Sequence, residues 1–524
     1  MSSSHTLRLS PAGLRLEIPA STPLQDVLFA QGVEFPCGGR GRCKGCRVKV
    51  LQGSLSISAE EKKLLTAAEL KDGWRLACRH AVNGDLELEL AQWEMPVLSD
   101  HSAFKFTPRP GLGIAIDLGT TTIAAQLLDL QTGNVLAVHT ALNAQAQHGS
   151  DIMSRVDFGV RGGQAELERT VRGQLGTVVK QLLASAQESR SRRGNEAELS
   201  AKAPPPHVGG YSTSESALVQ VAIVGNTVMH HLFCGVDITP LAGHPFVPQQ
   251  PGRFRFAPAQ LGWDLPSSVV VEFLPCIGGF VGSDVLAGIM ATGLHENGEL
   301  TALIDLGTNG EIVVGNHQRM ICASTAAGPA FEGARISMGM RAATGAISAV
   351  QAQDGAVVCR VIGGGEARGL CGSGLVDAVA AGLDLGWILP NGRMTASTGM
   401  ALAGRVVLDP RDVRELQLAK GAIAAGLRML AAQLGAKLGD IRRLHLAGAF
   451  GNYINRASAK RIGLLRVALE RVEPAGNTAL LGAKRALFED PAKWDAVAAR
   501  VEHAALNEDA SFHDIYGEEM QFPK

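Results

Sequence analysis

The chain has 524 residues, which is too long for one hydrophobic core, so we expect about three domains of roughly 100 to 200 residues. Lys and Arg (49) balance Asp and Glu (50), and this net charge of -1 argues against nucleic acid or a membrane surface as a partner. The N-terminus lacks the apolar core of a signal peptide, and no run of about 18 uncharged apolar residues predicts a membrane span, so we expect a cytoplasmic protein.

Residues 1–93 predict a small α+β domain. The segments HTLRLS and LRLEI alternate like the two strands of a hairpin, and STPLQDVLFAQG begins with residues that cap a helix. A stretch with three prolines follows, and prolines disfavour continued regular structure. We therefore assign residues 94–111 to a linker.

Four of the nine cysteines lie in this first domain. Cys37, Cys43 and Cys46 occupy one glycine-rich loop, FPCGGRGRCKGCRVKV, and Cys78 follows in WRLACRH. A cluster of two irons and two sulfides needs four thiolates, three from a loop that wraps around it and one from a remote element. Zinc is the alternative, but zinc ribbons pair two Cys-x2-Cys knuckles and this domain has one knuckle with two single cysteines. The pattern favours a 2Fe-2S cluster.

The segment also resembles the 2Fe-2S ferredoxin domain, including the RLAC run before the last cysteine. The first gap between its cysteines is five residues, similar to the adrenodoxin type rather than the plant type, whose gap is about four. The resemblance implies a β-grasp fold.

An internal repeat dominates the rest of the chain. Residues 111–142 and 301–325 share one plan, an apolar strand, an Asp-Leu-Gly-Thr turn and two further strands. Two copies predict a duplicated architecture with a cleft between its halves. We place the first part at residues 112–216 and the C-terminal part at residues 217–524. Within the first part, residues 188–216 are polar and rich in Pro, Gly and Ser, and we expect a mobile surface insertion there.

Each repeated turn places a carboxylate at a sheet edge, beside backbone N-H groups that can hold phosphate oxygens. The first turn contains Asp117, Gly119, Thr120, Thr121 and Thr122, and the second contains Asp305, Gly307, Thr308, Asn309 and Glu311. If they face each other across a cleft, the two turns would hold a triphosphate and its Mg²⁺ from both sides.

The two turns are similar to those of the ATP-binding architecture shared by acetate and sugar kinases, actin and Hsp-type chaperones. That resemblance implies an actin/RNase H-like fold with two lobes around a nucleotide cleft. Three later stretches agree with it, AGPAFEG, LCGSGLVD and HLAGAFG, and the last is expected to contact the adenosine. They contribute Gly328 from the first stretch, Gly372, Ser373 and Gly374 from the second, and Gly448 and Gly451 from the third.

The same resemblance implies roles for the polar residues. Asp117 and Asp305 would hold Mg²⁺ through water, and Glu311 or Glu332 would polarise the attacking water. The phosphates would lie against the hydroxyl and amide residues of the turns, Thr120, Thr121, Thr122, Thr308 and Asn309.

An iron-sulfur domain and an ATPase in one chain are useful together if ATP drives an electron to an acceptor that is hard to reduce. Over residues 5–490 the chain resembles the reductive activators of corrinoid-dependent enzymes, with further agreement at LNAQAQHGSDIMSRVDF and VAIVGNTVMHHLF. The resemblance implies a corrinoid protein or corrinoid methyltransferase as the acceptor, returned from Co(II) to Co(I), and an upstream low-potential electron donor. A homodimer is one option for its assembly.

Two alternatives from other classes stay open at this point. A redox-regulated small-molecule kinase would use the same cleft but would need an acceptor pocket and a catalytic base. An ATP-driven donor to a non-corrinoid enzyme would resemble the activators of 2-hydroxyacyl-CoA dehydratases. Those activators hold their cluster with cysteines of the ATPase region, and the ATPase half of this chain lacks a comparable pair.

Overall fold

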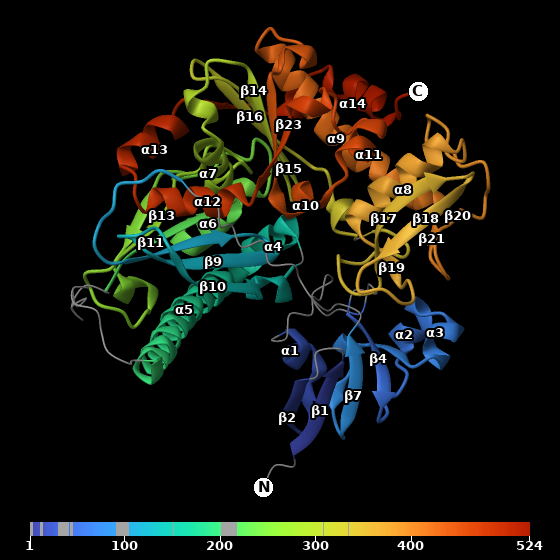
Figure 1. The fold of residues 1–524 in the computed structure, drawn as a ribbon, viewed down its shortest axis with the longest axis horizontal. Helices are drawn as coiled ribbons and strands as arrows, with labels where there is room; N and C mark the ends of the chain where they lie inside the picture. The colour runs from blue at the N-terminus through green and yellow to red at the C-terminus, as the bar shows by residue number, and fades with distance from the viewer. Residues whose placement is uncertain are drawn as a thin grey trace.

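The computed structural model describes residues 4–10, 14–29, 41, 46–90, 104–149, 151–200, 217–307, 309–333 and 335–524. Figure 1 shows a small N-terminal domain beside a larger body in which two lobes pack together. None of the helices in the described ranges combines the length and apolar character that a membrane span needs. The multidomain α/β architecture expected from the sequence is confirmed.

The N-terminal domain is a mixed sheet with short helices around it, in keeping with the expected β-grasp fold. Its strands lie in the order β2-β1-β7-β4-β5, with β1 antiparallel to β2 and parallel to β7. Leu7, Leu9 and Leu88 are buried, because alternate side chains of β1 and β7 face the same core. The elements are β1 Ser4–Ser10, β2 Leu14–Pro19, β3 Thr22–Pro23, α1 Leu24–Phe29, β4 Arg47–Gln52, α2 Ala59–Leu64, α3 Ala67–Lys71, β5 Trp74–Leu76, β6 Ala81–Val82 and β7 Leu86–Leu90.

The first lobe is built on a six-stranded sheet in the order β10-β9-β8-β11-β13-β12. Its central strand β8 is antiparallel to β9 and parallel to β11. Ile114 and Ile116 of β8 face one side of the sheet and Ala115 faces the other, and all three are fully buried, as expected for a central strand covered on both faces. Because β11 and β13 belong to this sheet, the first lobe continues beyond residue 216. Its elements are β8 Leu112–Leu118, β9 Thr122–Asp129, β10 Val135–Leu142, α4 Ile152–Phe158, α5 Gln164–Ser200, β11 Leu218–Gly225, α6 Thr227–Cys234, β12 Phe254–Phe256 and β13 Val270–Phe273.

The second lobe repeats this topology. Its large sheet has the order β23-β22-β14-β15-β16-β24, and β14 is antiparallel to β15 and parallel to β22. The strands β14-β15-β16-β22 therefore correspond to β8-β9-β10-β11, which confirms the predicted duplication. The elements of the large sheet are β14 Thr301–Leu306, β15 Gly310–Gly315, β16 Met320–Thr325, β22 Arg443–Ala447, β23 Val472–Gly476 and β24 Val501–His503.

A smaller sheet and several helices complete the second lobe. The small sheet has the order β18-β17-β19 and lies beside helix α8. Helix α7 Ser283–Thr292 precedes this lobe in the chain. The further elements of the lobe are β17 Ala346–Gln353, β18 Ala356–Val361, β19 Gly369–Leu370, α8 Gly372–Asp384, β20 Met400–Ala401, β21 Val407–Leu408, α9 Pro410–Gln433, α10 Gly448–Tyr453, α11 Arg456–Arg461, α12 Thr478–Ala486, α13 Pro491–Ala498 and α14 Phe512–Met520.

Helices α7 and α12 lie between the two large sheets and share one apolar core with both (Figure 1). This core joins Ala115 of β8 to Leu303 of β14. The helices approach closely, since a Cβ added at Gly482 of α12 would lie 2.5 Å from atoms of Ala287 of α7. The shared core therefore fixes the strands that lead into the two repeated turns relative to each other.

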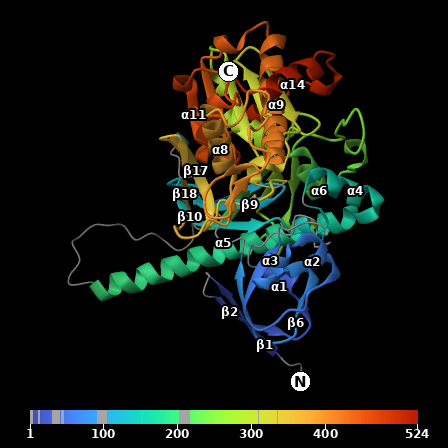
Figure 2. The same cartoon turned by 90° about the vertical axis from the view of Figure 1, so that its right-hand side faces the viewer.

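The N-terminal domain lies at one end of the molecule (Figure 2). Glu89 of β7 forms an ion pair with Arg368, which precedes β19 of the second lobe. The hydrogen bond from Lys49 is the main cause that lowers the pKa of Asp72, and the positive charge of Arg405 in the second lobe lowers it further. The N-terminal domain thus contacts the second lobe through charged side chains.

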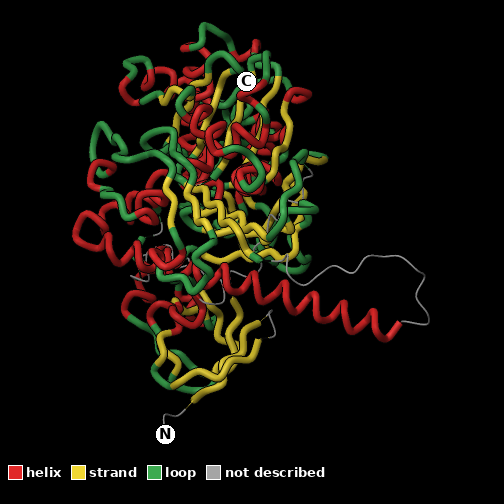
Figure 3. Tube along the Cα trace, turned by 90° about the vertical axis from the view of Figure 1, so that its left-hand side faces the viewer, coloured by secondary structure: helices red, strands yellow, loops and turns green. Residues whose placement is uncertain are grey.

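The expected mobile insertion at residues 188–216 begins inside helix α5. The backbone of α5 stays helical to Ser200, and Figure 3 shows it projecting from the body of the protein. Ala, Glu and Arg in this stretch favour a helix, and their propensity outweighs that of the interspersed serines. Residues 201–216 lie outside the described residues, so mobility there stays a prediction.

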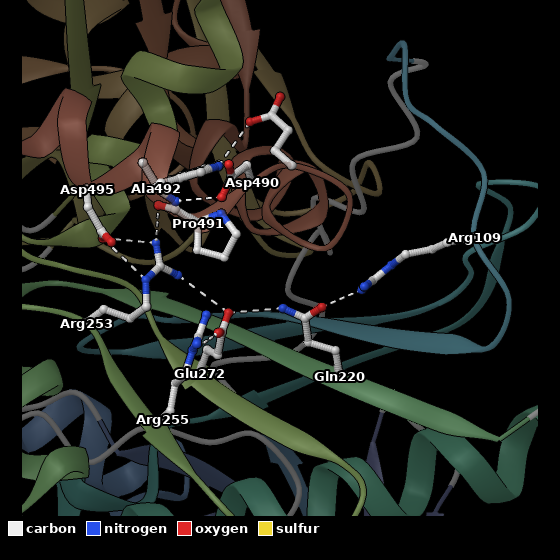
Figure 4. Close-up of polar contacts among 11 residues, drawn as sticks. Arg109, Gln220, Arg253, Arg255, Glu272, Asp490, Pro491, Ala492 and Asp495 are labelled. Atoms are coloured by element: carbon white, nitrogen blue, oxygen red, sulfur yellow. Dashed lines mark hydrogen bonds and ion pairs between the residues drawn. The ribbon is translucent and has the colours of Figure 1, made fainter.

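A buried polar network connects three parts of the chain (Figure 4). Arg109, at the end of the linker, donates to Gln220 of β11, and Gln220 donates to Glu272 of β13 at 3.0 Å. Arg253 pairs with Glu272 and with Asp495 of α13. The network therefore ties the linker and the first-lobe sheet to a helix of the second lobe.

Candidate functional site

A cavity of about 380 Å³ is lined by residues of both repeated turns. The predicted site residues that line it are Asp117, Gly119, Thr120, Thr121, Thr122, Asp305, Gly307, Asn309, Glu311, Glu332, Gly372, Ser373 and Gly448. Thr308 lies outside the described residues. The structure therefore brings together side chains that are separated by more than 300 positions in the sequence.

The first turn joins β8 to β9 and is closed by its own backbone. The N-H of Gly119 donates to the carbonyl of Thr122 at 3.1 Å, and a Cβ at Gly119 would lie 2.6 Å from that oxygen. Only glycine fits so close an approach. Asn226, which caps helix α6, donates from Nδ2 to the hydroxyl of Thr120 at 2.9 Å. The residue that directly follows the neighbouring parallel strand β11 thus orients the hydroxyl of the turn.

Asn143 supports the same turn from the other side. Its backbone N-H donates to the carbonyl of Thr121 at 2.8 Å, and its Nδ2 donates to the carbonyl of Gly119 at 2.9 Å. Asn143 is fully buried. It lies in the LNAQAQ stretch, so this stretch holds the backbone of the first turn in place.

The second turn joins β14 to β15 in the same way. The N-H of Gly307 donates to the carbonyl of Asn309 at 3.1 Å. Gly448, at the start of α10, packs against this turn, because a Cβ there would lie 2.5 Å from Oδ1 of Asp305. Its φ of +83° also favours glycine. The glycine of HLAGAFG therefore leaves room for the Asp305 carboxylate.

Four carboxyl groups of the cavity have raised pKa values, and the main cause in each case is burial. The pKa is raised to about 7 for Asp117 and Asp305, to about 6 for Asp284, and well above the ordinary value for Glu311. The charge of Asp284 adds to the shift of the other three. These groups repel one another when ionised, and a bound cation would relieve the repulsion.

The arrangement fits a cation held through water. In the part of the chain that the structure describes, no group of three or more His, Cys, Asp or Glu side chains is arranged to ligate one metal ion directly. Mg²⁺ commonly keeps several waters and uses one or two carboxylates together with phosphate oxygens. Water-mediated contacts to Asp117, Asp284 and Asp305 are therefore compatible with this geometry.

Among the lining residues that the sequence analysis missed, four carry a charged or amide side chain, namely Asp284, Asn226, Asn477 and Arg341. Asn226 follows the glycine that ends β11 in VAIVGNT, and Asp284 follows the glycine-rich loop GGFVGS at the start of α7, so each has a usable sequence signal. Asn477 caps helix α12 and donates from Nδ2 to Oδ2 of Asp117 at 3.2 Å. No local pattern marks Asn477 or Arg341, because tertiary packing alone brings them to the cavity.

Three predicted glycines are not among the lining residues. A Cβ at Gly374 would lie 2.1 Å from the carbonyl of Ile347, so this glycine allows α8 to pack on β17. Gly451 packs against Leu446, with its nearest contact at 3.2 Å. Gly328 has a φ of +75° and open space around its Cβ position. Packing or backbone conformation accounts for these glycines without a ligand.

Two aromatic rings form an apolar wall of the cavity. Phe331 and Phe450 stack with their centroids 4.7 Å apart and an interplanar angle of 24°. A Cβ at Gly372 would lie 1.8 Å from the carbonyl of Phe331, which explains the glycine at the start of α8. The wall combines residues of all three glycine-rich stretches and offers flat apolar surface beside the polar turns.

In the N-terminal domain, two of the four predicted cluster ligands are described. The Cys46 thiol is buried, and a hydrogen bond with it lowers the pKa of Cys78 to about 7 despite burial, helped by Arg79 and the N-H of Gly41. A lowered thiol pKa favours the thiolate, which is the form that binds iron. Cys37 and Cys43 lie outside the described residues.

The backbone around these thiols is tightly held. The N-H of Ala77 donates to the carbonyl of Cys46 at 3.0 Å, which fixes Cys78 next to β4. The buried carboxylate of Glu61 accepts from the N-H of Leu76 at 2.6 Å and contacts Nε2 of His80 at 2.8 Å. Gly41 has a φ of +63° and lies against the Arg79 side chain. The site fits a cluster whose sulfur ligands stand close together.

Comparisons with known proteins agree with this division of the chain. Three family models match it: the 2Fe-2S iron-sulfur cluster binding domain over residues 7–83, the RACo middle region over residues 112–193 and 209–297, and the C-terminal domain of RACo, the ASKHA domain, over residues 299–524. The middle-region model extends past residue 216, as does the first-lobe sheet.

Two similar proteins match most of the chain. The corrinoid activation enzyme RamQ of Eubacterium limosum is 32% identical over 461 residues, which cover 80% of this chain and 72% of that protein. The [Co(II) methylated amine-specific corrinoid protein] reductase of Methanosarcina barkeri is 26% identical and covers 78% of this chain and 77% of that protein. A solved structure, the reductive activator for corrinoid, iron-sulfur protein, has the same fold, with a TM-score of 0.65, 24% identity, and coverage of 99% of this chain and 98% of that one.

Proposed function

This chain belongs to the reductive activators of corrinoid proteins, and on that premise we propose that it reduces an inactive Co(II) corrinoid protein to Co(I) at the expense of ATP. The observation that carries the proposal is that one chain contains both a 2Fe-2S domain with adjacent thiols and a cavity lined by the two repeated Asp-Leu-Gly-Thr turns. The chain is an iron-sulfur redox enzyme by its family, and we further propose that it hydrolyses ATP.

The electron leaves from the N-terminal domain. Cys46 and Cys78 would hold the 2Fe-2S cluster together with Cys37 and Cys43, and the cluster supplies one-electron transfer. The buried contact between the Glu61 carboxylate and Nε2 of His80 holds the backbone next to Cys78. An upstream low-potential donor must return an electron to this domain after each turnover.

The nucleotide would occupy the cavity between the repeated turns. Thr120, Thr121 and Thr122 of the first turn and Thr308 and Asn309 of the second would bind its phosphates. Asp117, Asp284 and Asp305 would hold Mg²⁺ through water, and the ion would neutralise charge on the phosphates. Glu311 or Glu332 would then accept a proton from the attacking water.

ATP is needed because the transfer is unfavourable. For one electron a tenfold change in the equilibrium constant corresponds to about 59 mV, so a shortfall of a few hundred millivolts equals roughly 5 to 7 kcal/mol. A ligand shifts an equilibrium only by its different affinity for two states. The two lobes around the cavity provide such states if they close on ATP and open on its products.

The partner is a corrinoid protein or a corrinoid methyltransferase. We place the encounter in the cytoplasm, because free thiols at Cys234, Cys276 and Cys322 fit a reducing compartment. A homodimer is compatible with this reading. Neither nucleic acid nor a membrane is part of the proposal.

The test is an anaerobic absorbance assay with candidate corrinoid proteins. Reduced protein, MgATP and the Co(II) corrinoid protein are expected to give the Co(I) spectrum. Labelled ATP serves as the control for phosphotransfer: if phosphate moved to a metabolite while no corrinoid protein was reduced, the kinase alternative would replace this proposal.

A further inference from the structure

Arg341 is the sole Lys, Arg or His side chain among the described residues that line the cavity. The same lining holds five carboxyl groups, those of Asp117, Asp284, Asp305, Glu311 and Glu332. Burial lowers the pKa of Arg341 to about 10, so the guanidinium stays charged at neutral pH. Arg341 belongs to neither the two repeated turns nor the three glycine-rich stretches, so no motif singled it out.

The backbone next to Arg341 is fixed by strand pairing. The N-H of Met340 donates to the carbonyl of Leu370 at 3.0 Å, and the N-H of Leu370 donates to the carbonyl of Met338 at 2.9 Å. Leu370 belongs to β19 and is followed directly by Cys371 and Gly372, which also line the cavity. Arg341 therefore enters the cavity from an ordered segment that is bonded to another part of its wall.

A cavity whose charged side chains are five carboxyl groups and one guanidinium repels a polyphosphate unless further cations offset the charge. Mg²⁺ would offset it at the aspartates, which come from β8, α7 and β14. Arg341 comes from a different segment of the second lobe. A guanidinium presents planar, paired N-H donors that match phosphate oxygens, and it keeps its charge when buried.

We propose that Arg341 binds the phosphate chain of the nucleotide. The inference deepens the proposed function and rests on ATP as the ligand of this cavity. It assigns the second lobe a cationic contact to the phosphates, in addition to the backbone and hydroxyl groups of the two turns.

The experiment compares Arg341→Gln and Arg341→Lys with the wild type in isothermal titrations of ATP, ADP, AMP and adenosine, with Mg²⁺ present. Arg341→Gln is expected to weaken ATP binding about 10- to 100-fold, the range for a lost hydrogen bond to a charged group. The loss should shrink from ATP to AMP and vanish for adenosine. Arg341→Lys keeps the charge without the paired donors, so its affinity for ATP should lie between those of the wild type and Arg341→Gln.

Arg335→Gln is the matched control. Arg335 lies six residues earlier in the same segment, is exposed and does not line the cavity. Its variant should bind all four ligands like the wild type. The unfolding midpoint of each variant without nucleotide shows whether it is folded, and Arg341→Lys decides the matter if Arg341→Gln does not fold.

Two results would overturn the inference while leaving ATP as the ligand. In the first, the Arg341 variants bind ATP as tightly as the wild type. In the second, their affinity for adenosine falls as much as their affinity for ATP, which would mean that Arg341 shapes the pocket and does not contact phosphate. If the wild type itself binds no ATP, the proposed function fails and the inference fails with it.

Discussion

Asn477 donates a hydrogen bond of 3.2 Å from its Nδ2 to Oδ2 of Asp117, and so connects helix α12 to the first of the two repeated turns. The Oδ1 of the same side chain accepts from the N-H of Leu480 at 2.8 Å and caps the helix. The hydrogen bond opposes the raised pKa of Asp117, which burial and the charge of Asp284 cause. One amide therefore serves both a helix end and a site carboxylate.

The two roles of Asn477 can be separated. Asn477→Ser keeps an N-cap oxygen and removes the donor to Asp117, so we expect stability within about 1 kcal/mol of the wild type. We expect ATP to bind about tenfold more weakly, because the carboxylate loses a hydrogen bond to its charged form. Titration with MgATP and the unfolding midpoint measure the two effects. If Asn477→Ser bound ATP as tightly as the wild type, Asn477 would have no role in nucleotide binding.

We expect Asp284 to contribute to the pH dependence of stability in the protein without nucleotide. The raised pKa values of Asp117, Asp284 and Asp305, about 7, 6 and 7, mean that the folded state holds protons that the unfolded state has released. Stability from these groups is therefore present at low pH and lost as pH rises from about 4 to about 7. Asp284→Asn removes the shared charge, so its unfolding midpoint should exceed that of the wild type at pH 8 and approach it only near pH 4, where these groups are protonated in both states.

Asp237→Asn is the control for this measurement. Asp237 is exposed, and hydrogen bonds from Thr239 lower its pKa, so its neutral variant should gain nothing at pH 8. If Asp284→Asn also showed no gain at pH 8, the carboxyl groups of the cavity would not interact as described.

Cys78 is predicted to be a cluster ligand. Cys78→Ala should abolish the visible 2Fe-2S spectrum and electron transfer, while MgATP binding stays at the wild-type level because the cavity lies in another domain. Absorbance after anaerobic reconstitution measures the first effect and titration measures the second. Cys359→Ala, at a half-buried thiol of β18, should keep the full spectrum. An unchanged spectrum in Cys78→Ala would exclude Cys78 as a ligand.

Glu272 is the centre of the network in Figure 4. Glu272 is 3% exposed and pairs with Arg253, whose side chain is 10% exposed, and with Arg255, whose side chain is 58% exposed. Glu272→Gln therefore removes a buried carboxylate partner from Arg253. Because Arg253 keeps its ion pair with Asp495, we expect a loss of roughly 1 to 3 kcal/mol in the ATPase region. Differential scanning calorimetry measures it, while the cluster absorbance follows the N-terminal domain separately.

Glu502→Gln provides the comparison. Glu502 pairs with Arg319, and both side chains are about half exposed. Loss of such a surface pair should cost no more than about 1 kcal/mol. Equal effects of the two substitutions would show that the buried network does not hold the linker and the two lobes together.

The sequence predicted the parts of the site that recur or follow strands. The Asp-Leu-Gly-Thr turns are recognisable because a strand that ends in a small turn leaves its mark over a few consecutive residues. Gly448 also follows directly on a strand, β22, and a glycine is needed there because a Cβ would lie 2.5 Å from Oδ1 of Asp305. The duplicated sheets follow from these local patterns, since each copy contains its own turn.

Other features depend on distant packing and leave little trace in the sequence. Asn477 reaches Asp117 across 360 positions, and Arg341 is placed by pairing with Leu370. The length of helix α5 was missed for a different reason. Its last turns contain glycine and serine, which suggested an irregular segment, yet the helix continues through them.

The central claim is that nucleotide and cluster act together, and one anaerobic experiment tests it most directly. The wild type and Asp305→Ala are reduced to the same extent at the cluster, and each is mixed with a Co(II) corrinoid protein with and without MgATP. The account predicts rapid Co(I) formation only in the wild type with MgATP. Equal Co(I) formation by the wild type without nucleotide would contradict it.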